Sequence, residues 1–243
     1  MTWALVTGAA SRGGEAIARA LHARGHSVVI HHSPRSVAEA QGLVAALRSI
    51  RPESARAWCA DFELAPLAVP GWLVELAPEV LVCNASVYRP SRVDDASRAR
   101  SDLAVHLHAH GAILAALLPG APAADRDVAL RSVVAVTDVH VERPPRGYVW
   151  YTVAKAALQA MMAALAVDWA PRVRFNVVQP GSMPFPPDWT DGERAARIEA
   201  SIPMRRLGSF DDLACAVVWL ALDASYVTGQ VLAVDGGRSR HLV

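Results

Sequence analysis

Short apolar segments alternate with helical segments along the whole chain, and this alternation restricts the folds open to it. A strand is predicted at each short apolar or β-branched run: around Leu5 and at 28–30, 55–59, 80–83, 133–136, 174–178 and 231–234. The runs between them are predicted helices. Chains of this kind form a parallel sheet with helices on both faces, and their ligands bind at the carboxyl ends of the strands. We therefore expect an α/β fold with a seven-stranded parallel sheet.

Length and composition predict a single domain over residues 1–243. With 53% hydrophobic residues the chain is too apolar for disorder, and its net charge of +1 favours neither nucleic acid nor a membrane surface as a partner. The N-terminus passes directly into a strand, and the longest charge-free apolar helical run, 156–167, is too short to span a bilayer. A cytoplasmic protein is expected.

The cysteines and histidines give no pattern typical of a metal or disulfide site. Cys59, Cys83 and Cys215 are widely spaced in apolar surroundings, which predicts core packing. His106 and His110 would share a helical face, but no carboxylate or cysteine nearby completes a ligand set. No metal is expected.

The first predicted strand leads into a glycine-bearing turn at 7–14, followed by an amphipathic run over 15–24. Such a turn lets backbone N–H groups approach a pyrophosphate, and the helix that follows offers its positive end to the same anion. The turn therefore predicts a phosphate site. It departs from Gly-x-Gly-x-x-Gly, and an ordinary βα turn with glycines for packing is the alternative.

Tyr151 and Lys155 lie four residues apart, so on a helix they project from one face. A free tyrosine keeps its proton up to pH about 10, and a neighbouring ammonium could lower the pKa by stabilising the phenolate. The pair could thus act as an acid. A chance occurrence of this common spacing is the alternative.

Five motifs occur in the order typical of short-chain dehydrogenases/reductases, which the chain resembles over essentially its whole length. They are Thr7-Gly8-x-x-x-Arg12-x-Gly14, Asn84-Ala85-Ser86, Tyr151-x-x-x-Lys155, Pro180-Gly181, and Val227-Thr228-Gly229 with Asp235-Gly236-Gly237. The resemblance implies a single-domain Rossmann-type doubly wound fold, a nicotinamide cofactor, hydride transfer and a homotetramer.

Two departures from the common family pattern resemble the pteridine reductases and the related dihydromonapterin reductases. Asp138 stands thirteen residues before Tyr151, where most members carry serine, and Arg12 stands where most carry glycine. The resemblance implies NADPH-dependent reduction of a dihydropterin, which could be dihydromonapterin, dihydrobiopterin or dihydrofolate. The implied substrate contacts are Arg12, Ser86, Tyr88, Asp138 and Tyr151.

Asp138 suits a nitrogen heterocycle. A carboxylate beside Tyr151 could relay a proton to a ring nitrogen and accept hydrogen bonds from pterin N–H groups, which a ketone lacks. Its alternative role is to cap the loop 139–147. Tyr88 is expected to stack on the pterin with Ser86 beside it, or else to be a loop aromatic that covers the sheet edge.

The second predicted strand ends in His31-His32-Ser33-Pro34-Arg35-Ser36, without the acidic residue that favours NAD. Its donors and its cation suit a 2′-phosphate and predict NADPH, although Arg35 could simply open a solvated helix. The predicted cofactor contacts, most of them implied by the resemblance, are Gly8, Ser11, Arg12, Gly14, His31, His32, Ser33, Asp61, Phe62, Asn84, Ala85, Tyr151, Lys155, Pro180, Gly181 and Ser182.

The helix around 104–110 departs from the family at a position that often carries asparagine, which holds a water in the proton relay. His106 stands there, or His108 if the alignment is shifted by two residues. We count His106, with Asp138, Tyr151 and Lys155, among the candidate catalytic residues. His108 and His110 are expected to pack at a subunit interface.

Two irregular, proline-interrupted segments, 64–71 and 179–191, stand outside the periodic pattern. The second is a candidate lid within a variable substrate loop of about 179–209. Because its shape is open, two alternatives remain: an NADPH-dependent reductase for a 3-oxoacyl thioester or another ketone, and a non-catalytic cofactor-binding protein.

Overall fold

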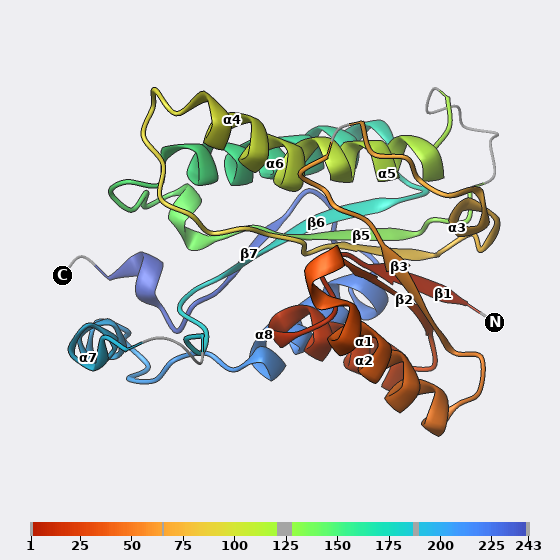
Figure 1. The fold of residues 1–243 in the computed structure, drawn as a ribbon, viewed down its shortest axis with the longest axis horizontal. Helices are drawn as coiled ribbons and strands as arrows, with labels where there is room; N and C mark the ends of the chain where they lie inside the picture. The colour runs from red at the N-terminus through yellow and green to blue at the C-terminus, as the bar shows by residue number, and fades with distance from the viewer. Residues whose placement is uncertain (1, 65, 121–127, 187–189, 242–243) are drawn as a thin grey trace.

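Figure 1 shows the computed structural model, which describes residues 2–64, 66–120, 128–186 and 190–241. Seven strands form one sheet in the order β3-β2-β1-β4-β5-β6-β7, and every neighbouring pair is parallel. Their bounds are β1 Trp3–Val6, β2 Ser27–His32, β3 Ala55–Cys59, β4 Val80–Cys83, β5 Ser132–Val136, β6 Arg174–Pro180 and β7 Val231–Val234. The predicted strands and the doubly wound α/β fold are confirmed.

Helices cover both faces of the sheet (Figure 1). One face carries α4 (Ala96–Leu103), α5 (Ala109–Leu117) and α6 (Val149–Asp168), and the other carries α1 (Arg12–Ala23), α2 (Val37–Ile50) and α8 (Phe210–Val218). The remaining helices are α3 (Gly71–Glu75) and α7 (Gly192–Ala200), and a π-helical segment η2 (Ala104–His108) joins α4 to α5. The short helical segments are η1 (Pro34–Ser36), η3 (Val139–Val141), η4 (Trp219–Asp223) and η5 (Arg238–Arg240).

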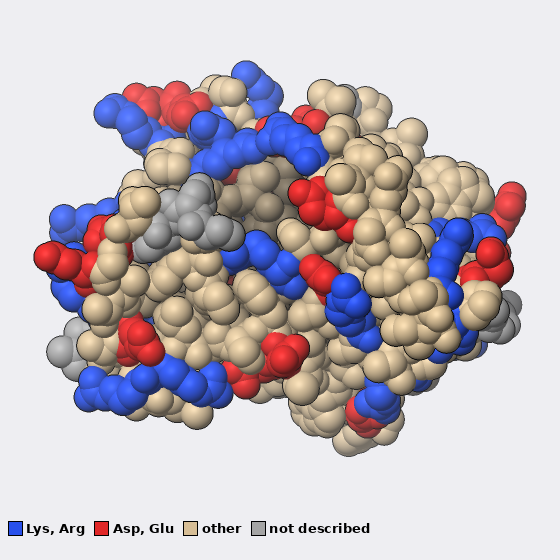
Figure 2. Space-filling model, turned by 60° about the horizontal axis from the view of Figure 1, so that its bottom comes forward, with Lys and Arg blue, Asp and Glu red and all other residues tan. Residues whose placement is uncertain are grey.

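The central strands are apolar on both sides because both faces are covered by helices. On one face Ile113, Leu158 and Phe175 belong to a single buried cluster, and on the other Ile17 and Val217 belong to a second. Burying this much apolar surface is the main force that holds the helices on the sheet. On the surface drawn in Figure 2, basic and acidic side chains are interspersed.

The structure corrects the cysteine and helix predictions. Cys83 is buried as expected, but Cys59 and Cys215 are exposed, so the prediction of core packing is wrong for these two. Cys59 lies at the end of the edge strand β3, where only alternate side chains are buried. Helix α1 begins at Arg12, three residues before the predicted start, because Ser11 in extended conformation is its N-cap.

Helix α6 is longer than the apolar run that predicted it. It has 20 residues, includes Lys155, and is the one helix in the described part of the chain that could cross a membrane by length and composition alone. Leu158, Met162 and Ala166 nevertheless pack into the core. The apolar character of α6 is that of a core helix packed on the sheet.

Gly14 is required by a close backbone approach. A Cβ on Gly14 would lie 2.1 Å from the Gly8 carbonyl oxygen and 2.7 Å from Asn84 Nδ2. We expect Gly14→Ala to lower the free energy of unfolding by about 3 kcal/mol because the glycine turn must move. Urea denaturation measures the change.

The control is Gly42→Ala in α2, where a Cβ meets nothing within 4 Å. This change should raise stability by about 0.5–1 kcal/mol, because alanine favours the helix. Equal stability of the Gly14→Ala variant and the wild type would contradict the close approach.

Candidate active site

The sheet reverses its winding between β1 and β4, and a crevice opens at the carboxyl ends of these two strands. The Thr7 hydroxyl joins the two strand ends, because it accepts hydrogen bonds from the backbone N–H groups of Asn84 (2.8 Å) and Ala85 (2.9 Å). The Asn84 amide donates in return to the carbonyls of Thr7 (3.0 Å) and Gly8 (3.1 Å). The two predicted motifs therefore lie side by side.

Two adjoining cavities of about 210 and 350 Å³ lie along this edge and share Gly8, Ser11 and Ser86 in their walls. The smaller cavity is lined by the end of β2 and by the segment after β3, including Asp61 and Phe62. The larger one reaches Asp138, Tyr151, Lys155 and Pro180. Together they form an elongated groove that most of the predicted site residues line.

The glycine turn suits an anion. Gly8 has a left-handed φ of +62°, and Ser11 leaves the N-terminus of α1 without a side-chain cap. The first N–H groups of a helix have no intrahelical partner, so an anion can bind them. Arg12 lies over the Phe210 ring at 5.0 Å and donates to the Pro184 carbonyl at 2.6 Å, which ties the predicted lid to this turn.

His31 stabilises the glycine turn through a hydrogen bond to Gly8. Its Nδ1 accepts the Gly8 N–H at 3.0 Å, its Nε2 donates to the Ala60 carbonyl at 3.2 Å, and its ring stacks on Phe62 at 3.9 Å. Burial lowers the pKa of His31 to about 3, so the ring is neutral. Both ring nitrogens are thus engaged, contrary to the expectation that His31 offers a donor to a phosphate. His32 is also buried, and its Nδ1 donates to the Ser33 carbonyl at 2.9 Å.

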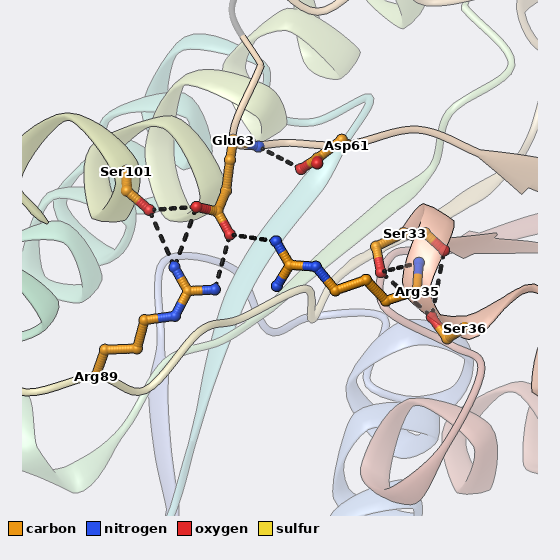
Figure 3. Close-up of polar contacts among 7 residues, drawn as sticks. All are labelled: Ser33, Arg35, Ser36, Asp61, Glu63, Arg89 and Ser101. Carbon is orange, nitrogen blue, oxygen red and sulfur yellow. Dashed lines mark hydrogen bonds and ion pairs between the residues drawn. The ribbon is translucent and has the colours of Figure 1, made fainter. Parts of the chain in front are cut away.

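Glu63 lines the smaller cavity and contacts two arginines, Arg89 and Arg35. Figure 3 shows these contacts. Arg89 forms two hydrogen bonds with the carboxylate (2.8 and 3.1 Å), and Ser101 of α4 donates to it at 2.9 Å. Arg35 approaches only to 3.7 Å, and 71% of its side chain is exposed. Arg35 is therefore a cation that can turn toward a bound anion. No sequence motif indicated Glu63 or Arg89, which come from separate loops.

Tyr151, Asp138 and Lys155 meet at the far end of the groove. The Tyr151 hydroxyl donates to Asp138 Oδ2 at 2.6 Å, and Lys155 Nζ donates to the Val136 carbonyl at 2.8 Å. Asp138 Oδ1 also accepts the backbone N–H of His140 at 2.8 Å. Asp138 therefore both caps the loop that follows and contacts the tyrosine, so the two roles proposed for it are compatible.

The electrostatics differ from the expectation drawn from the Tyr151–Lys155 spacing. Burial, then the charge of Asp138 and the hydrogen bond to it, raise the pKa of Tyr151 well above its usual value. The prediction that Lys155 lowers this pKa is wrong, because the carboxylate is nearer to the phenol than the ammonium is. Burial would raise the pKa of Asp138, but the hydrogen bond and charge of His140, with the Tyr151 hydroxyl, lower it. At neutral pH Tyr151 holds the proton and Asp138 is ionised.

His106 and His110 are both buried inside the chain, whereas His108 is exposed. His106 Nδ1 donates to the Asp102 carbonyl at 2.8 Å, and its Nε2 accepts from the Ser86 hydroxyl (3.0 Å) and the Val87 N–H (3.2 Å). Of the two histidines considered, His106 is therefore the one that lies against the loop after β4. Its contacts support the loop at 86–88.

His110 does not lie at a subunit interface as expected. Its Nδ1 donates to the His106 carbonyl at 2.9 Å, and its Nε2 lies 3.0 Å from the Thr7 hydroxyl. It is fully buried, so the interface prediction is wrong for this residue. The π-helical turn of η2 places His106 and His110 toward the sheet, and such turns often occur at functional sites.

Aromatic rings cluster beside Tyr151 without lining either of the two cavities. Tyr88 is half exposed, stacks on Tyr148 with centroids 4.3 Å apart, and meets Tyr151 edge-to-face at 4.8 Å. His140 lies beyond Tyr88 at 6.4 Å. Tyr148 and His140 were not predicted, although their closeness in sequence to Tyr151 and Asp138 is a signal that could have indicated them.

The end of β6 closes the groove. A Cβ on Gly181 would lie 2.6 Å from the Cβ of Asp235, so the two chain segments touch there. Ser182 is bonded to Arg238 of η5. Pro187 and residues 188–189 of the predicted lid, like Ala65 of the segment 64–71, lie outside the described residues. Across the described ranges, no group of three or more His, Cys, Asp or Glu residues is arranged to hold a metal.

Several known proteins are similar to this chain. Residues 76–239 match a family model described as Enoyl-(Acyl carrier protein) reductase. Pteridine reductase 1 of Leishmania tarentolae is 32% identical over 278 residues, which covers 97% of this chain and 96% of that protein. Granaticin polyketide synthase putative ketoacyl reductase 2 of Streptomyces violaceoruber is 32% identical over 250 residues, covering 96% and 94%.

A solved structure extends this similarity to the fold. The alternative dihydrofolate reductase 1 FolM of Brucella canis, complexed with NADP, superposes with a TM-score of 0.84 at 27% identity. The match covers 100% of this chain and 95% of that one.

The buried Lys155 makes stability depend on pH. Burial lowers its pKa to about 8, although the charge of Asp138 opposes this, whereas an unfolded lysine titrates near pH ~10.4. Between these values the unfolded chain binds more protons, so stability rises with pH. We expect the wild type to gain about 3 kcal/mol of unfolding free energy relative to Lys155→Met between pH ~8 and ~10.5.

Urea denaturation of both proteins across this range measures the difference. Lys155 is the only lysine in the sequence, so a single side-chain NMR signal reports its titration directly. Parallel stability curves, or a lysine that titrates near its ordinary value, would contradict the prediction.

Proposed function

The chain belongs to the short-chain dehydrogenase/reductase family, and we propose that within this family it is an NADPH-dependent reductase of dihydropterins. The observation that carries the proposal is the 2.6 Å hydrogen bond from Tyr151 to an ionised Asp138. A ketone develops negative charge on oxygen as it is reduced, and a carboxylate at this position would repel that charge. A pterin instead presents N–H groups, which a carboxylate accepts.

The groove has the features that a dinucleotide requires. The uncapped start of α1 and the glycine turn suit the pyrophosphate, while Asp61, Phe62 and Ala85 line the cavity at the adenosine end. Lys155 and Tyr151 would lie against the nicotinamide ribose, close to Pro180. When bound, NADPH supplies the hydride.

The residues of this chain then direct the proton and orient the substrate. Tyr151 and Asp138 both line the larger cavity, so the hydrogen-bonded pair can deliver a proton to the imine nitrogen while the imine carbon is reduced. Ser86 is fixed by His106, and the half-exposed Tyr88 offers an aromatic ring beside Tyr151. Arg12 lines the same cavity as Tyr151.

Support for NADPH over NADH comes from the segment after β2. It has no carboxylate at the strand end, and it offers the hydroxyls of Ser33 and Ser36 with the exposed guanidinium of Arg35. The FolM neighbour was solved with NADP. We also infer from the family resemblance that the protein is cytoplasmic and a homotetramer.

A 3-oxoacyl thioester is the second candidate substrate, because the similar Streptomyces protein is a putative ketoacyl reductase. The test is to incubate the pure protein and NADPH with dihydropterins or with 3-oxoacyl thioesters and to follow NADPH oxidation. Oxidation with the thioester alone would favour the second candidate. Tight NADPH binding without oxidation of NADPH by any substrate would favour a non-catalytic protein.

Removing the Asp138 carboxylate tests its role in proton delivery. We expect Asp138→Ser to lower kcat/KM for the dihydropterin about 100-fold, because the proton donor loses its partner, with NADPH affinity unchanged. The control is Asp168→Asn, an exposed aspartate at the other end of α6, which should behave as wild type. Full activity of Asp138→Ser would refute the assignment.

Arg35 tests the choice of cofactor. It is exposed, so Arg35→Gln should fold normally, whereas a change at the buried His32 could disturb the strand end. Loss of one arginine–phosphate contact should raise the Kd for NADPH about 10-fold and leave that for NADH unchanged. Arg92→Gln, which removes an exposed arginine paired with Asp94, is the matched control. Equal weakening for both cofactors would place the 2′-phosphate elsewhere.

A further inference from the structure

His140 contacts the Asp138 oxygen that does not bind Tyr151, and it has no part in the proton delivery described so far. Its Nδ1 lies 3.0 Å from Asp138 Oδ1, the same oxygen that accepts its backbone N–H. The other carboxylate oxygen, Oδ2, accepts the Tyr151 hydroxyl. Asp138 thus connects the residue that faces the groove to a titratable ring.

The Tyr151–Asp138 pair alone is a poor proton source. At neutral pH it holds one proton and one negative charge, because the pKa of Tyr151 is raised and that of Asp138 is lowered. Giving this proton to a substrate would leave a phenolate and a carboxylate within hydrogen-bonding distance in a buried site. Like charges so close strongly disfavour that state. The pair therefore needs a second proton when the transfer occurs.

We propose that His140 supplies this proton, which passes from its imidazolium Nδ1 to Asp138 and so allows the Asp138–Tyr151 pair to protonate the substrate nitrogen. The proposal rests on the proposed function, in which a hydride from NADPH adds to the imine carbon. In each cycle one His140 N–H bond breaks and one substrate N–H bond forms. Asp138 returns to the carboxylate, and the ring is left neutral with its proton on Nε2. Because Nδ1 is buried, the ring must turn before Nδ1 takes its next proton from water.

The position of the ring suits this role. Its side chain is 25% exposed, against 17% for Asp138, although Nδ1 itself is buried, so water reaches the ring away from this nitrogen. Histidine is also the side chain whose protonation changes in the neutral range. Asp138 is the only carboxylate within ion-pair distance of the ring in the described part of the chain.

The other titratable and charged groups around the ring do not replace this contact. They are Tyr88 from the loop after β4, Tyr148 and Tyr151 at the start of α6, Lys155 in α6, Arg194 of α7, and Glu142 and Arg143, which follow in the chain. Glu142 is the one carboxylate among them, and in the described part of the chain it forms no ion pair with the ring.

The first test is the pH profile of kcat for dihydropterin reduction at saturating NADPH. Glutamine at position 140 keeps a donor toward Asp138 but does not titrate. We expect His140→Gln to be 10- to 100-fold slower (about the range of a proton donor) at neutral pH. Its kcat should also lose the decline that the wild type shows as pH rises through the neutral range.

An unchanged NADPH Kd shows that the variant is folded, and His241→Gln, at an exposed histidine near the C-terminus, should keep the wild-type profile. A His140→Gln enzyme with the wild-type pH profile would overturn the proposal. A uniform loss of rate with the profile retained would also overturn it, because that outcome indicates a structural role.

The second test needs no substrate. In the cofactor-free protein the side-chain nitrogen NMR signal of His140 should shift in Asp138→Asn, because Nδ1 loses its anionic partner. Asp168→Asn should leave this signal unchanged. An unchanged signal in Asp138→Asn would refute the coupling whatever the substrate is. A wild type that shows the coupling but oxidises no NADPH with any dihydropterin would refute the proposed function instead, so the two failures are distinguishable.

Discussion

The Thr7 hydroxyl is the contact on which the site depends. It has two acceptor positions and one proton, and the structure uses all three. The N–H groups of Asn84 and Ala85 fill the acceptor positions. The proton can be directed to His110 Nε2 at 3.0 Å, because the Nδ1 of that ring already donates to a carbonyl, and the Val82 carbonyl is a second acceptor for it at 3.2 Å. Burial lowers the pKa of His110 to about 4, so the ring is neutral and Nε2 can accept. One side chain thereby links β1, the segment after β4 and helix α5 at the point where the sheet reverses its winding.

The sequence predicted the fold and part of the site, namely those features that depend on local patterns in the chain. Each strand is a local apolar run, so periodicity located all seven strands. Asp138 and Tyr151 stand at the end of β5 and the start of α6, and motif spacing placed them together correctly. The pairing of Glu63 with Arg89 was not predicted, because loop conformation decides where those side chains point.

The sequence spacing also could not give the direction in which the pKa of Tyr151 shifts. The four-residue separation from Lys155 is real, but burial and a carboxylate at 2.6 Å outweigh the ammonium. Lys155 is itself buried, and burial lowers its pKa to about 8. Sequence identifies which groups are neighbours, whereas the sign of a pKa shift depends on depth and distance. For this reason the site acts as a hydrogen-bonded pair with the proton held on Tyr151, and a separate source of protons becomes necessary.

Three buried histidines at the site differ physically from His140, and this difference supports a distinct role for His140. His31, His106 and His110 are at most 3% exposed, and burial is the largest cause that lowers the pKa of each. Each neutral ring donates through one nitrogen and accepts through the other, so these residues act as fixed bridges between backbone segments. A ring committed in this way cannot exchange a proton without losing a bond that holds the site together. His140 makes no such bridge among the described residues, contacts a carboxylate and reaches solvent, so protonation of its ring strengthens its contact with Asp138 and breaks no bridge of this kind.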